Sequence, residues 1–214
     1  MKKLLWLMLG AMGWLAAGSL RAEENAMLAA ALACRQEPAP LLRLDCYDRA
    51  LAQNGVVAVP SPAQAGPAWR RAMNQERGRN DHSLAFLISD RGGDNPLVVL
   101  TTPAIGIPPP RPVLMFSCID NITRLQVALS APVQEGDGRV LLATEKNSLS
   151  LRWFVRENGF LLESSRGLAG IQQIRQLFGA QRLTLTPQNG ATSLTFNITG
   201  LAQEIEPLRK ACHW

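Results

Sequence analysis

The histidines are the first residues to consider for chemistry, and the chain has only two, His82 and His213. His82 lies in the run Asp81-His82-Ser83, which contains the three residue types of a Ser-His-Asp triad. Neighbouring residues of an extended chain point to opposite faces, so these three cannot form the relay that nucleophilic catalysis requires. We therefore interpret the run as a polar turn before a strand, and the sequence predicts no catalytic residue.

The cysteines are the next candidates, and there are four of them: Cys34, Cys46, Cys118 and Cys212. Successive cysteines are 12, 72 and 94 residues apart. Structural zinc sites usually bring their ligands in close pairs such as Cys-x-x-Cys, and the sequence has neither such a pair nor a paired-histidine motif. The sequence therefore predicts no metal site and no cofactor.

Carboxylates and arginines leave two weaker alternatives open. Two carboxylates that meet in space can act as general acid and base. The candidates are Asp90, Asp94, Glu145 and Glu163. A basic run can meet an anionic headgroup or a glycan, although a solvated segment is the more common outcome. This run consists of Arg70, Arg71, Arg77 and Arg79.

The first 22 residues have the pattern of a secretory signal peptide. Lys2 and Lys3 precede an apolar stretch over residues 4–17, and cleavage is expected after Ala22. The stretch is shorter than the ~20 residues of a membrane-spanning helix, and no later segment is long and apolar enough to cross a membrane. Without Lys2, Lys3 and Arg21, 19 basic residues remain against 17 acidic ones, which gives no reason to expect a nucleic-acid partner. We expect a mature protein in the periplasm.

In an oxidising compartment, four cysteines predict two disulfides, for which three connectivities exist. Residues 23–53 have a helical pattern interrupted by Pro38 and Pro40, so Cys34 and Cys46 lie on two short helices that one bridge can join. Residues 54–68 are rich in small residues and proline and predict a linker. A β-rich domain is expected over residues 69–214.

The β-rich domain is expected to contain short antiparallel strands followed by two hairpin-helix units in tandem. The strands are expected at 83–89, 97–101, 113–118, 124–130 and 139–144. In the first unit, strands 149–156 and 160–163 flank a turn and precede a helix at 168–178; in the second, strands 182–186 and 192–198 precede a helix at 201–212. The class is α+β. Cys118 and Cys212 fall on apolar faces, which favours a second bridge between them.

Several motifs together resemble the VasI (TagO) family of proteins associated with type VI secretion. They are Arg43-Leu44-Asp45-Cys46-Tyr47-Asp48, Asn80-Asp81-His82-Ser83, Cys118-Ile119-Asp120-Asn121-Ile122-Thr123, Arg166-Gly167-Leu168 and the ending Ala211-Cys212-His213-Trp214. His82 interrupts the aspartate-serine pair that is common in the family. The resemblance implies a periplasmic accessory protein and carries over no enzymatic residue.

The leading hypothesis is a non-enzymatic adaptor whose partners are periplasmic components of the secretion apparatus or nearby peptidoglycan. One alternative is an enzyme that acts on cell-wall glycan through a carboxylate pair, which a cleft holding two carboxylates roughly 5–10 Å apart would support. Another is a secreted effector or immunity protein.

Overall fold

The structure, a computed structural model, describes residues 26–52, 60–80, 82–93, 95–133, 136–188 and 192–214. The chain divides into two units, Met1–Ala58 and Val59–Trp214. The predicted signal peptide, residues 1–22, lies outside the described residues, and so do residues 54–59 of the predicted linker. No helix in the described ranges is long and apolar enough to cross a membrane.

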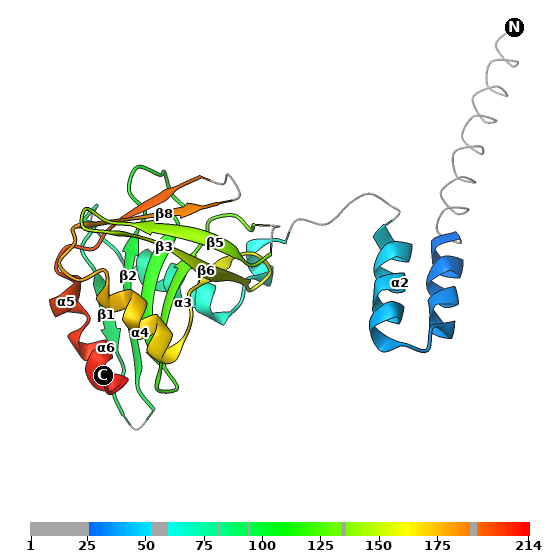
Figure 1. The fold of residues 1–214 in the computed structure, drawn as a ribbon, viewed down its shortest axis with the longest axis horizontal. Helices are drawn as coiled ribbons and strands as arrows, with labels where there is room; N and C mark the ends of the chain where they lie inside the picture. The colour runs from blue at the N-terminus through cyan, green and yellow to red at the C-terminus, as the bar shows by residue number, and fades with distance from the viewer. Residues whose placement is uncertain (1–25, 53–59, 81, 94, 134–135, 189–191) are drawn as a thin grey trace, which may run out of the picture. The chain divides into compact units, whose positions relative to one another are not determined.

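The N-terminal unit is a helical hairpin. Residues 26–33 are helical, the 3-10 turn η1 (Cys34–Gln36) follows, and α2 (Pro40–Ala52) lies beside the first helix (Figure 1). A disulfide joins Cys34 to Cys46, with their Cα atoms 5.6 Å apart. Six leucines of the hairpin are exposed: Leu28, Leu32, Leu41, Leu42, Leu44 and Leu51. Because so little apolar surface is buried, the disulfide contributes much of what holds the hairpin together.

The second unit is built on a nine-stranded sheet with the order β1-β2-β3-β4-β7-β6-β5-β8-β9, in which every neighbouring pair is antiparallel. The strands are β1 (Leu87–Asp90), β2 (Leu97–Pro103), β3 (Val113–Ile119), β4 (Ile122–Ala128), β5 (Gly138–Ala143), β6 (Ser148–Arg156), β7 (Leu161–Glu163), β8 (Arg182–Pro187) and β9 (Leu194–Asn197). The predicted α+β class is confirmed.

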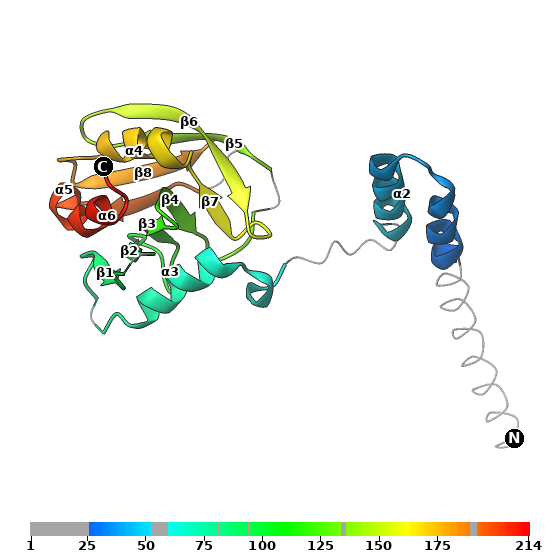
Figure 2. The ribbon, with the colours of Figure 1, turned by 90° about the horizontal axis from the view of Figure 1, so that it is seen from below.

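The sheet curls so that β9, at one end, comes beside the chain that follows β2, near the other end (Figure 2). An isolated bridge pairs Ala104, just after β2, with Phe196 on β9, and the Ile105 N–H donates to the Thr195 carbonyl at 2.8 Å. The enclosed core contains Phe116, Trp153 and Phe196, each at most 1% exposed. Burial of such aromatic side chains dominates core energetics.

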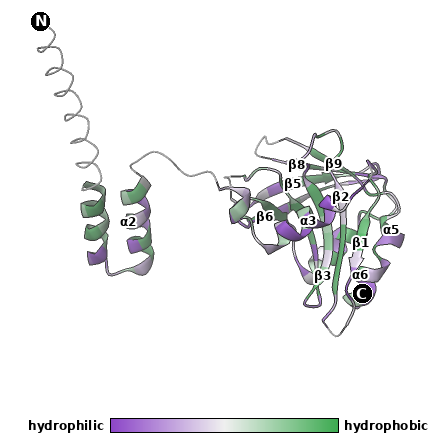
Figure 3. Cartoon of the chain, turned by 180° about the vertical axis from the view of Figure 1, so that it is seen from behind, coloured by the Kyte–Doolittle hydropathy of each residue, from purple (hydrophilic) through white to green (hydrophobic). Residues whose placement is uncertain are grey.

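The outer face of β2, β3 and β4 is covered by helix α3 (Pro67–Arg77). Ala68 and Ala72 pack there against Val99 and Met115 in a second apolar cluster. The sequence did not predict this helix: it placed a linker up to residue 68 and strands after it, whereas the structure has the 3-10 turn η2 (Pro62–Gln64) and then α3. Trp69 and Met73 pack against the same cluster, and the other side chains of the helix are largely polar (Figure 3), so its stability depends on the sheet that it covers.

Three short helices complete the unit: α4 (Gly167–Arg175), α5 (Leu201–Glu204) and α6 (Glu206–Ala211). The single helix expected at 201–212 is broken at Ile205, because Pro207 in the first turn of α6 cannot donate the N–H bond that would continue α5. A disulfide joins Cys212 to Cys118 on β3, with Cα atoms 5.7 Å apart. Both disulfides are the pairs that the sequence predicts.

The C-terminal Trp214 is tied to β4 by one hydrogen bond. Its indole Nε1–H donates to Thr123 Oγ1 at 2.8 Å, and Thr123 is 1% exposed. The guanidinium groups of Arg175 and Arg209 lie 5.3 and 5.4 Å from the indole ring. Cys118 on β3 pairs with Thr123 on β4, so Trp214 and the disulfide attach the last residues to neighbouring positions of two paired strands.

We expect Trp214→Phe to lower the free energy of unfolding by about 1–2 kcal/mol, because it leaves the buried Thr123 hydroxyl without its donor while keeping an aromatic ring for the arginines. Urea unfolding of the mature protein measures this. In a Thr123→Val background the same substitution should cost almost nothing, and equal costs in both backgrounds would show that the hydrogen bond is not the cause.

Candidate functional site

An open groove of about 1000 Å³ runs along α3. Its other wall is the proline-rich loop between β2 and β3, which includes a cis peptide bond between Pro109 and Pro110. The described side chains that line it include Pro62, Trp69, Arg70, Met73, Asn74, Glu76, Arg77, Asn80, His82, Pro109, Pro110, Arg111 and Val113. Residues from two distant parts of the sequence, 62–82 and 109–113, therefore form one surface.

Helix α3 is held in place at both ends. At its start the Glu157 carboxylate accepts hydrogen bonds from the N–H groups of Ala68 and Trp69, both at 2.9 Å, which satisfies two donors that a helix leaves free. A Cβ at Gly66 would collide with the Glu157 side chain, so glycine makes this approach possible. Further along, Gln75 Nε2 donates to the Leu87 carbonyl at 2.7 Å.

A buried ion pair fixes the end of α3 and the segment that follows. Arg79 pairs with Glu76 at 2.8 Å, with side chains only 7% and 11% exposed. The Arg79 guanidinium also donates to the Ser83 carbonyl at 3.1 Å and the Ala85 carbonyl at 2.9 Å. The interpretation of the basic run as a solvated segment is therefore wrong for Arg79, whereas Arg70 and Arg77 are exposed.

The groove combines an apolar floor with a basic rim. Trp69 is partly buried against the edge of Phe160, with ring centroids 5.7 Å apart, and donates its Nε1–H to the Leu129 carbonyl at 2.7 Å. Met73 and Val113 also line the groove. Exposed Arg70 and Arg77 and half-buried Arg111 add positive charge. Arg111 Nε is buried, and no described residue forms a hydrogen bond with it.

The only carboxylate among the described lining residues is Glu76, which is engaged by Arg79 and accepts a hydrogen bond from Thr101 Oγ1 at 2.6 Å. The described part of the groove thus lacks a carboxylate pair for acid-base chemistry. Its shape and composition suit the binding of an extended segment that carries apolar and acidic side chains.

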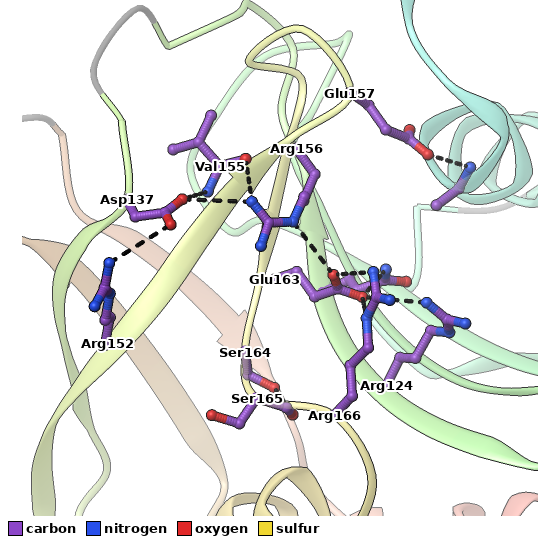
Figure 4. A network of polar contacts seen from close by, with 12 residues as sticks. Arg124, Asp137, Arg152, Val155, Arg156, Glu157, Glu163, Ser164, Ser165 and Arg166 are labelled. Carbon is purple, nitrogen blue, oxygen red and sulfur yellow. Dashed lines mark hydrogen bonds and ion pairs between the residues drawn. The ribbon is translucent and has the colours of Figure 1, made fainter. Parts of the chain in front are cut away.

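A second cluster of polar side chains surrounds Glu163 on β7 (Figure 4). Glu163 is 1% exposed, and its carboxylate accepts two hydrogen bonds from Arg166, at 3.0 and 2.6 Å, and one from Gln126 Nε2 at 2.8 Å. Arg124 Nη1 and Arg156 Nε lie 3.5 and 4.0 Å from its oxygens. Its carboxylate raises the pKa of Arg166, chiefly through the side-chain hydrogen bond.

The carboxylates that the sequence offers as an acid-base pair have different surroundings. Asp90 accepts a hydrogen bond from the Gly92 N–H at 2.8 Å, and Glu145 lies 3.5 Å from Arg182. The pKa of Glu145 is below its usual value, mainly because its own backbone N–H donates to it. Glu163 is enclosed by arginines, and Asp94 lies outside the described residues. The three described carboxylates, Asp90, Glu145 and Glu163, therefore do not interact with one another.

The cysteines are used in the two disulfides, and in the parts of the chain that the structure describes no group of three or more His, Cys, Asp or Glu side chains can hold a metal ion. His82 is exposed at the rim of the groove. The sequence did not single out Met73 or Arg111. No local sequence pattern identifies these residues as parts of one groove, because α3 and the proline-rich loop come together only in the folded protein.

The motifs quoted from the sequence have separate structural roles. Cys118 and Cys212 form the long-range disulfide, Thr123 holds Trp214, and Asp120 and Asn121 make the tight β3–β4 turn with φ of 54° and 57°. Arg166 pairs with Glu163, and the following Gly167 has a φ of 60°, a conformation that favours glycine. Asn80 and His82 line the groove.

The chain matches the protein family described as "Type VI secretion system VasI, EvfG" over residues 33–214. Neither the comparison with curated proteins nor that with solved structures found a match. The matched range covers the stapled hairpin from just before Cys34 and the whole β-rich unit, including the groove and the Glu163 cluster. The chain therefore belongs to the VasI family of proteins associated with type VI secretion systems.

Proposed function

We propose that this protein is an exported, non-enzymatic adaptor of a type VI secretion system, which binds a segment of a periplasmic component of the apparatus in the groove along α3. The family supplies the association with type VI secretion. Two disulfides are typical of proteins from oxidising compartments, which supports the periplasm.

The observation that carries the binding role is the groove itself. Its apolar floor at Trp69 and Met73 can bury side chains of a partner, and its rim has a net positive charge from Arg70, Arg77 and Arg111. Charge complementarity steers association and selects partners. The expected occupant is an extended polypeptide segment that alternates apolar and acidic residues.

The cell-wall enzyme is the weaker candidate, because the groove has Glu76 as its single described carboxylate and that group is paired with Arg79. A glycosidase needs two carboxylates on either side of the scissile bond.

Charge reversal at the rim tests the proposal. We expect Arg70→Glu with Arg77→Glu to reduce the amount of secretion-apparatus protein that co-purifies with the tagged protein from the periplasm by about tenfold or more, because acidic partner residues would then face like charges. Mass spectrometry of the eluate measures it, and N-terminal sequencing of the same sample reports cleavage after Ala22. Both arginines are exposed, so stability should change by less than about 0.5 kcal/mol.

The matched control is Arg139→Glu with Lys146→Glu, which changes the net charge equally at exposed positions outside the groove. It should retain the partner. Loss of partner in both double variants, or in neither, would refute the groove as the docking surface. Capture of peptidoglycan fragments in place of apparatus proteins would refute the protein partner.

A further inference from the structure

The cluster around Glu163 borders a pocket of about 280 Å³, where the start of α3 meets β4 and β7. Its charged lining consists of the four arginines Arg71, Arg124, Arg156 and Arg166 and the two carboxylates Glu157 and Glu163. The pocket therefore holds two more positive than negative charges. It is a separate feature from the groove, and its chemistry is independent of whether a partner docks there.

Both carboxylates are already engaged. Glu157 accepts the two N–H groups at the start of α3, at 2.9 Å each. Glu163 accepts the two hydrogen bonds from Arg166 and the one from Gln126. Arg156 has a further partner, since Asp137 lies 3.5 Å from it. The excess positive charge thus falls on Arg71 and Arg124.

Arg124 has only part of its hydrogen-bonding capacity used. Its Nη1 lies 3.5 Å from Glu163 Oε1, while its Nε is buried and has no hydrogen-bond partner among the described residues. The side chain is 17% exposed, so water replaces little of what is missing. A buried donor without a partner costs free energy that a bound acceptor would recover. Gln126, 2% exposed, likewise has its Oε1 without a partner.

Arg71 is the second arginine of the pocket with unused hydrogen-bonding capacity. Within the described ranges, no hydrogen bond or ion pair engages its guanidinium. Its pKa is lowered, first because burial disfavours the charged form and then because Arg124 and Arg91 lie nearby, although Glu157 acts in the opposite direction. Two guanidinium groups that repel each other in a half-buried pocket are a favourable place for an anion.

The uncharged walls indicate what kind of anion fits. Ala68, Ile119 and Leu161 line the same pocket. They provide apolar contacts for a small aliphatic group, which inorganic phosphate lacks. The planar guanidinium fork matches a carboxylate with two parallel hydrogen bonds.

We infer that this pocket binds the terminal carboxylate of a peptide that ends in a small aliphatic residue, with Arg71 and Arg124 on the carboxylate and Ile119 and Leu161 against the side chain. Two sources share this chemistry: the C-terminus of a protein and the stem peptide of peptidoglycan, which ends in D-alanine. The experiment must separate them.

The test is a titration of the mature, full-length protein with short peptides, followed by NMR of the arginine Nε–H signals. The probes are N-acetyl-L-alanyl-L-alanine, N-acetyl-D-alanyl-D-alanine, the C-terminal amide of each, and inorganic phosphate. We expect at least one free acid to bind saturably, to shift the Arg71 and Arg124 signals, and to bind about tenfold or more tightly than its amide. Preference for the L or the D peptide identifies a protein or a cell-wall source.

Arg71→Gln and Arg124→Gln should each weaken binding of the free acid about tenfold or more, whereas Arg152→Gln, an exposed arginine outside the pocket, should leave it unchanged. Arg71→Lys keeps the positive charge but loses the planar guanidinium. Its affinity for the free acid should therefore lie between those of the unsubstituted protein and Arg71→Gln. Equal binding of acid and amide, no saturable binding of either acid, or phosphate binding as tightly as the acids would overturn the assignment. The probe comparison on the unsubstituted protein decides the question even if a variant fails to fold.

Discussion

Removing the Cys118–Cys212 disulfide is expected to lower the free energy of unfolding of the second unit by about 4–5 kcal/mol. The bridge closes a loop of 94 residues, for which loop-closure entropy alone gives about 4.7 kcal/mol. Its two cysteines join β3, at the centre of the core, to the end of α6. Urea unfolding of the Cys118→Ala, Cys212→Ala protein, followed by the fluorescence of Trp69, Trp153 and Trp214, which all lie in the second unit, measures the change.

The control is the equivalent removal of Cys34 and Cys46, which closes a loop of only 12 residues in the other unit. Loop-closure entropy gives about 3 kcal/mol for a loop of that size, and this loss should fall on the helical hairpin. The urea midpoint of the tryptophan fluorescence transition should therefore stay unchanged. If both double variants shift that transition equally, the two units do not unfold separately.

The second large effect is expected at Glu163, where Glu163→Gln should lower the free energy of unfolding by about 3 kcal/mol. The carboxylate is 1% exposed and is the shared acceptor for three arginines. Breaking a buried ion pair by removing one partner typically costs about 3–5 kcal/mol. We expect the lower end of this range of free energies, because the Arg166 side chain is half exposed and can be solvated by water once the carboxylate is gone.

Asp137→Asn is the matched control for Glu163→Gln, since it makes the same chemical change in the same network. Asp137 pairs with Arg152 and Arg156, which are 71% and 42% exposed. Such exposed pairs contribute about 1 kcal/mol or less. Urea unfolding of both variants at neutral pH compares them, and equal costs would mean that burial does not set the strength of the network.

The strands and turns were largely predictable because they depend on local patterns. The apolar runs of β2 and β3 reflect strands buried on both faces, and the Asp120-Asn121 turn uses residues that tolerate positive φ. The cysteine spacing argued against a zinc site. The position of Cys34 and Cys46 on two adjacent short helices favoured the first disulfide, and the apolar faces around Cys118 and Cys212 favoured the second. Pro207 also marked the break between α5 and α6, a signal that the helical periodicity of residues 201–212 obscured.

The sequence by itself therefore determined the α+β class, the order of most strands along the chain and the residues that form disulfides. Only the tertiary structure decided that residues 67–77 form a helix, because its small alanine face becomes stable only against Val99 and Met115. The same holds for the groove and for the arginine pocket. Arg71 and Arg124 lie 53 positions apart in the sequence, and strand pairing with helix packing, which no local pattern records, brings their charges together.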